Sequence, residues 1–247
     1  MSEKRRTAFI TGSGRNIGRA IALSLAADGL NVVINGSTRR ELCEPVAEEA
    51  RALGVEASVI MGNIASKEDL ARMTASALEQ FGTVDVLVNN AAIRPRKPFL
   101  DMTEEEWDLV FDTNLKSLFR LSQAFLPGMI DKGWGRVIGF TGMNAIKGHE
   151  GRAHGSAVKH GVWGLVKALA AEFGSSGVTV NAISPGPILG DRDTQEKANQ
   201  IADDVKYIPI GRLGAPDEVA AVASMLASDR GAFVNGQMIQ VNGGAAM

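Results

Sequence analysis

The chain has 247 residues, a formal net charge of −2 and a single cysteine, Cys43. This length suits one α/β domain with a sizeable buried core. The composition, 45% hydrophobic and 22% charged, argues against a disordered chain. The near-neutral charge makes a nucleic-acid partner unexpected, and no run of about 18 apolar residues predicts a membrane span. One cysteine fits a reducing compartment, so we expect a cytoplasmic protein.

Short apolar, β-branched runs alternate with longer amphipathic segments along the whole chain. Because the apolar residues of the runs are nearly continuous, the runs predict strands of a sheet buried on both faces. The order of strands and helices predicts an α/β fold, a Rossmann-type doubly wound parallel sheet of about seven strands with helices on both faces, as a single domain over residues 1–247. The predicted strands are Ala8–Thr11, Val32–Asn35, Ala57–Met61, Val84–Asn89, Arg136–Thr141, Val178–Ile183 and Met238–Val241.

Helix start and stop signals lie between these strands. Ile17–Asp28 ends at Gly29, and Pro216 suits the first turn of a helix that continues to Ala227. A capping box at Thr103 opens a predicted helix over Glu104–Lys132. That helix and the predicted helix Ala153–Ser175 carry apolar residues on more than one face, and we expect a homodimer or homotetramer to bury them. The residues concerned are Trp107, Phe111, Leu118 and Phe119 on the first helix, and Val162, Trp163, Val166 and Leu169 on the second.

A glycine-rich turn follows the first predicted strand. It reads Thr11-Gly12-Ser13-Gly14-Arg15-Asn16-Ile17-Gly18 and leads into a predicted helix. Glycine lets the backbone approach a pyrophosphate closely, and the helix N-terminus offers free N–H groups and a positive dipole end. Its place between strand and helix favours a dinucleotide site. The alternative is a tight turn without a ligand.

The sequence here resembles the short-chain dehydrogenase/reductase family, and in particular its 3-oxoacyl-ACP reductase-like members, over nearly the whole chain. Thr11, Gly12 and Gly18 match the family's T-G-x-x-x-G-x-G motif, and Asn16 stands at its middle glycine. Asparagine tolerates the left-handed conformation better than most residues, so the turn can persist. Further matches, in the family's order, are Asn89-Asn90-Ala91-Ala92, Asn114, Asn181 followed by Pro185-Gly186, and the closing segment Gly236–Gly244.

The resemblance implies a bound nicotinamide dinucleotide. Because no carboxylate stands at Gly36, after the second strand, to bind a ribose 2′-hydroxyl, and Arg15 and Arg39 lie nearby, we expect NADP rather than NAD. Alternatively, the arginines belong to a solvated helix start. The implied cofactor-binding residues are Gly12, Ser13, Arg15, Asn16, Ile17, Gly18, Ser37, Arg39, Asn63, Ile64, Asn90, Lys159, Pro185, Gly186 and Ile188.

The catalytic set implied by the resemblance is incomplete. Lys159 matches the family's lysine, and Asn114 its water-ordering asparagine. The tyrosine four residues before the lysine is replaced by Gly155, and the serine thirteen residues earlier by Gly142. The 2,4-dienoyl-CoA reductase branch also lacks that tyrosine, but uses one from the preceding loop, where this chain has Asn144.

Two side chains next to the vacant positions are candidate substitutes. His154 titrates near neutrality and is the first choice, and the Thr141 hydroxyl is the second. The alternative for His154 is a cap histidine without chemistry. His149 and His154 are five residues apart, about 140° around a helix, so we predict no metal site.

The leading interpretation is an NADP-dependent short-chain oxidoreductase with an atypical acid/base set. Hydride would pass between nicotinamide and a carbonyl, alcohol or activated alkene of a small-molecule substrate, which a lid over residues 190–207 would cover. The second interpretation is a catalytically inactive dinucleotide-binding homologue that acts as a sensor or structural subunit.

Overall fold

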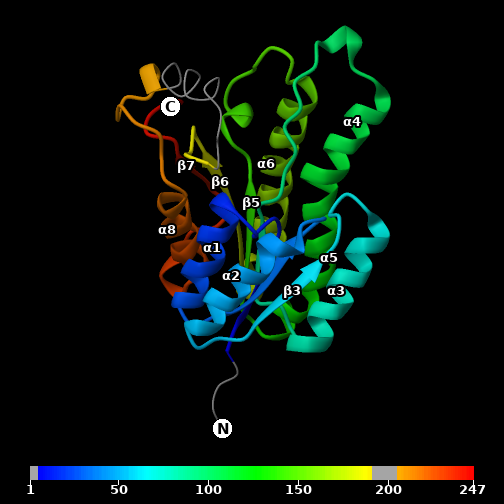
Figure 1. Cartoon of the computed structure of the whole chain (residues 1–247), viewed down its shortest axis with the longest axis vertical. Coiled ribbons are helices and arrows are strands. Elements are labelled where there is room, and N and C mark those ends of the chain that lie inside the picture. The colour runs from blue at the N-terminus through cyan, green and yellow to red at the C-terminus, as the bar shows by residue number, and fades with distance from the viewer. Residues whose placement is uncertain (1–4, 191–204) are drawn as a thin grey trace.

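A computed structural model describes residues 5–190 and 205–247 of the chain. Its centre is one sheet of seven parallel strands in the order β3-β2-β1-β4-β5-β6-β7 (Figure 1). The chain builds outward from β1 to β3 and then returns to the other side of β1 with β4, which creates a switch point between β1 and β4. The strands are β1 Thr7–Ile10, β2 Asn31–Gly36, β3 Ala57–Met61, β4 Val86–Asn89, β5 Gly135–Phe140, β6 Val178–Pro185 and β7 Met238–Val241.

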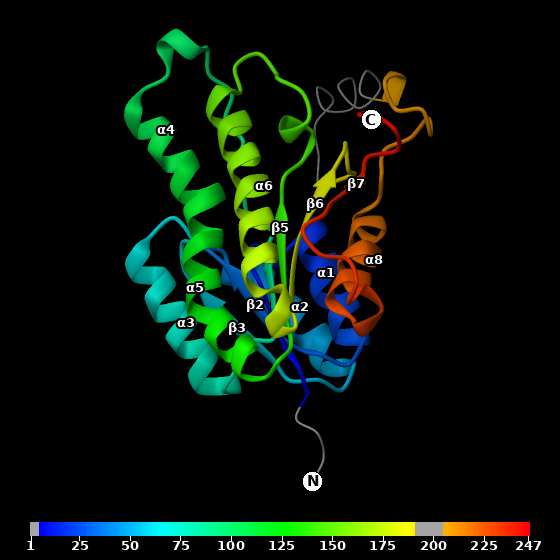
Figure 2. The same cartoon turned by 180° about the vertical axis from the view of Figure 1, so that it is seen from behind.

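Helices cover both faces of the sheet, as Figures 1 and 2 show from opposite sides. Helices α1 (Asn16–Ala27), α2 (Arg40–Ala52) and α8 (Pro216–Ala227) enclose one apolar core. Helices α3 (Lys67–Phe81), α5 (Ser117–Asp131) and α6 (Ala153–Phe173) enclose the other. The predicted doubly wound parallel sheet is therefore confirmed. In the part of the chain that the structure describes, no helix is long and apolar enough to cross a membrane.

The segment predicted as one helix over Glu104–Lys132 is divided. The Thr103 capping box is present, and α4 (Glu104–Phe111) passes into a π-helical turn, Asp112–Lys116, before α5 begins. Single π-turns are frequent at functional sites because they redirect side chains within a helix. Here the turn buries Thr113 and Asn114. The segment is therefore helical as predicted, and the π-helical turn within it was not predicted.

Fewer apolar side chains of α4, α5 and α6 face the surface than the sequence pattern predicted. Leu118, Val162 and Val166 were expected to face a partner chain, but all three are buried in the core beneath α5 and α6. Their apolar character is satisfied within the chain. Phe119 and Leu109 remain on the surface, 46% and 51% exposed.

The two-layer core predicts a large difference between buried and exposed leucines. Leu25 is completely buried on α1, whereas Leu53 at the end of α2 is 51% exposed. Leu25→Ala should lower the free energy of unfolding by about 2–5 kcal/mol, because it removes buried methylenes and leaves a cavity. Leu53→Ala is the matched control and should change it by less than about 1 kcal/mol. Urea unfolding measures both, and equal losses would contradict this description of the core.

Candidate active site

The glycine-rich turn between β1 and α1 brings two backbone segments into close approach. A Cβ at Gly18 would lie 2.2 Å from the Gly12 carbonyl oxygen, so only glycine fits there. Gly12 has φ = 62° and Asn16 has φ = 50°, both left-handed. Asn16 therefore adopts the conformation expected of the glycine that it replaces.

Asn90 fixes this turn from the end of β4. Its Nδ2 donates to the carbonyl oxygens of Thr11, at 3.0 Å, and Gly12, at 3.2 Å. The backbone N–H of Ala91 donates to Thr11 Oγ1 at 2.9 Å. The amide of Asn90 thus holds the turn in shape, which makes it a positioning residue for the pocket.

Two further polar side chains tie the turn to the neighbouring strand. The hydroxyl of Ser13 donates to the Ile10 carbonyl at 2.8 Å and accepts from Asn35 N–H at 2.9 Å. Asn35 accepts from Gly12 N–H at 3.3 Å and donates to the Ile60 carbonyl at 3.0 Å. Ser13 is completely buried, so its hydroxyl supports the strand ends rather than the pocket that we expected it to line. Asn35 was missed as a site residue, although a polar residue inside an apolar strand was a usable signal.

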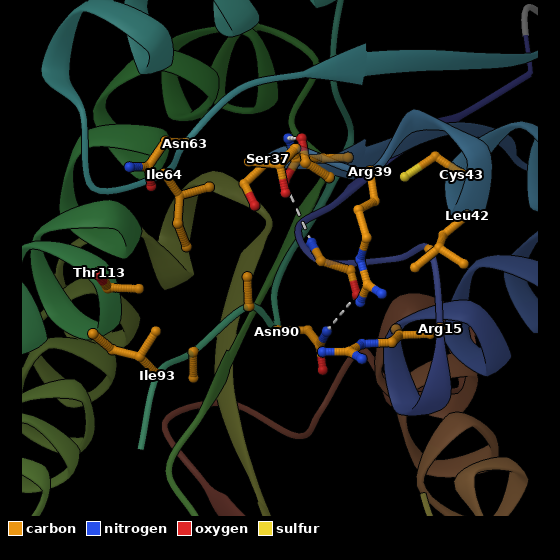
Figure 3. Close-up of a pocket in the computed structure, with 18 of the residues that line it drawn as sticks. Arg15, Ser37, Arg39, Leu42, Cys43, Asn63, Ile64, Asn90, Ile93 and Thr113 are labelled. Carbon is orange, nitrogen blue, oxygen red and sulfur yellow. Dashed lines mark hydrogen bonds between the residues drawn. The ribbon is translucent and has the colours of Figure 1, made fainter. Parts of the chain in front are cut away.

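A pocket of about 530 Å³ opens beside the turn, at the switch point of the sheet (Figure 3). Predicted cofactor residues that line it are Gly12, Arg15, Asn16, Ile17, Gly18, Ser37, Arg39, Asn63, Ile64 and Asn90. The sequence did not identify Leu42, Cys43, Ile93, Arg94, Leu109 and Thr113, which also line it. Pro185 ends β6, Gly186 and Ile188 follow it, and none of the three borders this pocket.

One end of the pocket is basic. The side chains of Arg15 and Arg39 both line it, and Figure 3 draws their guanidinium groups at the same end. No carboxylate can be added easily at Gly36, because a Cβ there would lie 2.6 Å from Cys43 Sγ. The Cys43 thiol is buried, and this burial raises its pKa. The negative charge of nearby Glu44 raises the pKa further.

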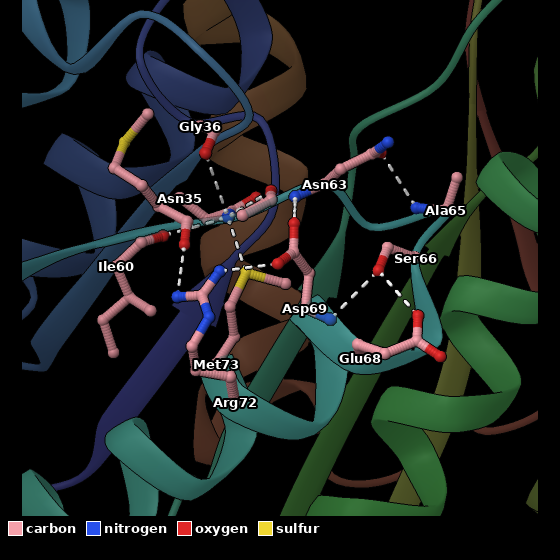
Figure 4. A network of polar contacts seen from close by, with 12 residues as sticks. Asn35, Gly36, Ile60, Asn63, Ala65, Ser66, Glu68, Asp69, Arg72 and Met73 are labelled. Atoms are coloured by element: carbon pink, nitrogen blue, oxygen red, sulfur yellow. Dashed lines mark hydrogen bonds and ion pairs between the residues drawn. The ribbon is translucent and has the colours of Figure 1, made fainter.

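A polar network at the start of α3 fixes the edge of the pocket next to Asn63 (Figure 4). Asp69 accepts from Asn63 N–H at 2.7 Å and from Arg72 at 2.7 Å, and these bonds lower the pKa of its carboxyl group. The Asn63 Oδ1 atom accepts from Ala65 N–H at 3.0 Å. Asn63 therefore keeps a fixed backbone position at the pocket edge.

The side chains of Lys159 and Asn114 form hydrogen bonds with backbone atoms. Lys159 Nζ donates to the Phe140 carbonyl at 2.6 Å. Its burial, with a smaller effect of the Arg94 charge, lowers the pKa of Lys159 to about 7. Asn114 donates to the Ile93 carbonyl at 2.9 Å and accepts from Ile93 N–H at 3.0 Å. The π-helical turn thus anchors the loop after β4.

The backbone at the missing serine has a conformation reserved for glycine. Gly142 has φ = 86° and ψ = 175°, and the nearest atom to a Cβ there would be the Pro185 carbonyl oxygen at 3.8 Å. The neighbouring Thr141 is buried, and its hydroxyl donates to the Ile183 carbonyl at 3.3 Å. That hydroxyl is directed toward β6.

His154 is buried at the start of α6, with 1% of its surface exposed, and does not border the pocket. Its Nδ1 accepts from Gly155 N–H at 2.8 Å, and its Nε2 has no partner among the described residues. Burial lowers the pKa of His154, Arg152 lowers it further and Glu106 of α4 opposes them. The ring therefore favours its neutral form.

The expected lid over residues 190–207 falls mostly on residues 191–204, which lie outside the described part of the chain. Tyr207, the single tyrosine of the sequence, is 77% exposed. Among the described residues, no three histidine, cysteine or acidic side chains gather as metal ligands.

Comparison with known proteins gives close matches over nearly the whole chain. The family described as enoyl-(acyl carrier protein) reductase matches residues 12–246. A 3-oxoacyl-[acyl-carrier-protein] reductase of Staphylococcus epidermidis is 41% identical over 98% of this chain and 99% of its own length. An acetoacetyl-CoA reductase of Cupriavidus necator is 37% identical over 98% of this chain and 99% of its own.

A solved structure gives the same result for the fold. The crystal structure of a putative NAD(P)-dependent gluconate 5-dehydrogenase from Beutenbergia cavernae, with bound NADP at low occupancy, has a TM-score of 0.90 and 36% identity. The match covers 97% of this chain and 96% of that one. Together with the turn at Gly12 and the seven-stranded sheet, these matches show that the chain belongs to the short-chain dehydrogenase/reductase family.

Proposed function

We propose that the protein is an NADP-dependent oxidoreductase that interconverts a small carbonyl compound and its alcohol. The turn at Gly18 carries this proposal. A Cβ there would clash with the Gly12 carbonyl oxygen and with Asn90, so glycine is needed for the tight turn that presents the N-terminus of α1 to the pocket. The relatives named as reductases, and the neighbouring structure with NADP, support it. When bound, the reduced nicotinamide supplies the hydride.

The basic end of the pocket supports NADP over NAD. Arg15 and Arg39 supply two guanidinium groups suited to a phosphate monoester, and Ser37 lines the pocket beside them. The backbone N–H groups at the start of α1 would face the pyrophosphate. Among the described residues that line the pocket there is no acidic side chain to oppose a 2′-phosphate.

Arg39→Gln should raise the Kd for NADPH about tenfold or more and leave the Kd for NADH unchanged. The reason is the loss of a charge-assisted bond to a group that only NADPH carries, about 1.5–3 kcal/mol. Calorimetry measures both dissociation constants. Arg230→Gln, which changes an exposed arginine, is the matched control. Equal weakening of both cofactors would refute the phosphate site. Gly36→Asp is a poorer test, since its side chain would clash with Cys43.

We further propose that Lys159 moves the proton in place of the absent tyrosine. Its pKa of about 7 lets it hold or release a proton near neutrality, and it lies one helical turn from Gly155. Lys159, His154 and Thr141 are all buried and none of them borders the pocket, so Lys159 is preferred for its place one helical turn after Gly155 and its lowered pKa.

The pH dependence of carbonyl reduction separates Lys159 from His154. An acid must be protonated to donate, so kcat/KM should fall as the pH rises through about 7 if Lys159 is the donor. With His154 the fall would occur below its ordinary value of 6.5, because its pKa is lowered. Lys159→Arg should reduce kcat by about 100-fold or more and abolish this pH dependence. His154→Ala should keep the profile, and a fall centred below pH 6.5 in the native protein would exclude Lys159.

The inactive alternative is favoured by one observation, the glycine-only conformation of Gly142. A serine cannot be restored there without strain. Turnover of NADPH with a panel of ketones and enones tests this alternative directly. Binding of NADPH without turnover of any of them would make the sensor or structural role the better account.

We also propose a homodimer or homotetramer. Exposed apolar side chains lie on the segment before α4 and on α5, namely Phe99, Leu100 and Phe119. Burying such a patch against a second copy is favourable. Light scattering at micromolar concentration should therefore give a mass at least twice 26.1 kDa, and a monomer would refute it.

A further inference from the structure

Two loops beside the pocket carry four cationic side chains and a histidine, and one of the cations, Arg94, lines the pocket. The first loop follows β4 and contains Arg94 and Arg96, and the second precedes α6 and contains Lys147, His149 and Arg152. We refer to these five residues as the basic rim.

The two loops are bonded to each other, so the rim has a defined shape. Lys97 N–H donates to the Gly151 carbonyl at 3.0 Å. Arg152 Nη1 donates to the carbonyl oxygens of Arg94 and of Pro95, the latter at 2.9 Å. The Arg96 side chain packs over Gly151, where a Cβ would meet its Cγ at 2.9 Å.

The charges of the rim are concentrated and act on one another. Arg96 contributes to lowering the pKa of both Arg152 and His149, in each case after the effect of burial. Lys97 is neutralised by Glu106 at 3.0 Å and lies outside the cluster. Glu150 is the acidic residue within the second loop. The rim is therefore locally positive on a chain whose formal net charge is −2.

Arg94 connects this rim to the reacting end of the site. Its exposed side chain lines the pocket beside Ile93, which is bonded to Asn114. Its charge also reaches Lys159, whose pKa it helps to lower. The charge of a group bound by Arg94 would thus also act on Lys159, the residue proposed above to move the proton.

We propose that the substrate carries a carboxylate near its carbonyl group, and that Arg94 binds this carboxylate with support from Arg96. This inference rests on the proposed reductase function and names its substrate class. A guanidinium group matches a carboxylate with two parallel hydrogen bonds. The surrounding rim would favour entry of anions over neutral carbonyl compounds.

Matched acid and ester substrates test the proposal. With saturating NADPH, the native protein should reduce acetoacetate with a kcat/KM at least about tenfold above that for ethyl acetoacetate, since one charge-assisted contact is lost in the ester. Arg94→Gln should bring the ratio of the two kcat/KM values to about one, and because the ratio is taken within one variant it does not depend on how strongly that variant binds NADPH. Arg230→Gln, at an exposed position in the turn Asp229–Gly231 that does not line the pocket, is the control and should keep the preference.

The outcomes separate this inference from the function on which it rests. Equal use of acid and ester by the native protein, or a preference that survives Arg94→Gln, would overturn the carboxylate site while leaving the reductase intact. If the native protein reduces neither compound, the reductase proposal fails for this pair. Calorimetry of acetoacetate with the NADP⁺-saturated protein then decides. Binding that weakens about tenfold in Arg94→Gln supports the site, and no binding overturns it.

Discussion

The site depends on one close approach of backbone to backbone at the start of α1. Gly18 passes so near the Gly12 carbonyl that a methyl group at Cα has no room. Asn90 fixes the approach by donating to both carbonyls on the other side of the turn. This contact determines where α1 begins and how its N–H groups face the pocket. It also joins β1 to β4 at the switch point, where a doubly wound sheet offers its binding crevice.

Many of the polar side chains around the pocket serve the backbone rather than a ligand. Ser13, Asn35, Asn90 and Asn114 each use their hydrogen-bonding groups on neighbouring carbonyl or N–H groups. Buried polar groups need such partners, and the bonds hold the loops in fixed positions. The charged side chains that line the pocket are then all arginines, Arg15, Arg39 and Arg94, among the described residues. Under the proposed function, proton transfer is assigned to Lys159, which lies outside the pocket lining and whose burial lowers its pKa to about 7.

The sequence predicted the strands and the sheet well because an apolar run buried on both faces has a strong local pattern. It also predicted the left-handed Asn16, since few residues other than glycine accept that conformation. Helix contacts were harder to predict. Val162 and Val166 were placed outside because periodicity does not show which apolar face meets the sheet. The π-helical turn at Asn114 and the glycine-only backbone at Gly142 depend on tertiary contacts and have no local sequence signal. The sequence did not predict the basic rim, because its charged residues lie on two loops that are far apart in the sequence.

Calorimetry of NADPH with Gly18→Ala tests the central claim most directly, because the single added methyl group occupies the space of the close approach. Gly164→Ala, on α6 with no atom within 4 Å of the new Cβ, is the control. The account predicts that Gly18→Ala keeps its helical circular dichroism but binds NADPH at least about 100-fold more weakly, while the control binds like the native protein. Native affinity in Gly18→Ala would contradict the claim that this turn forms the cofactor site.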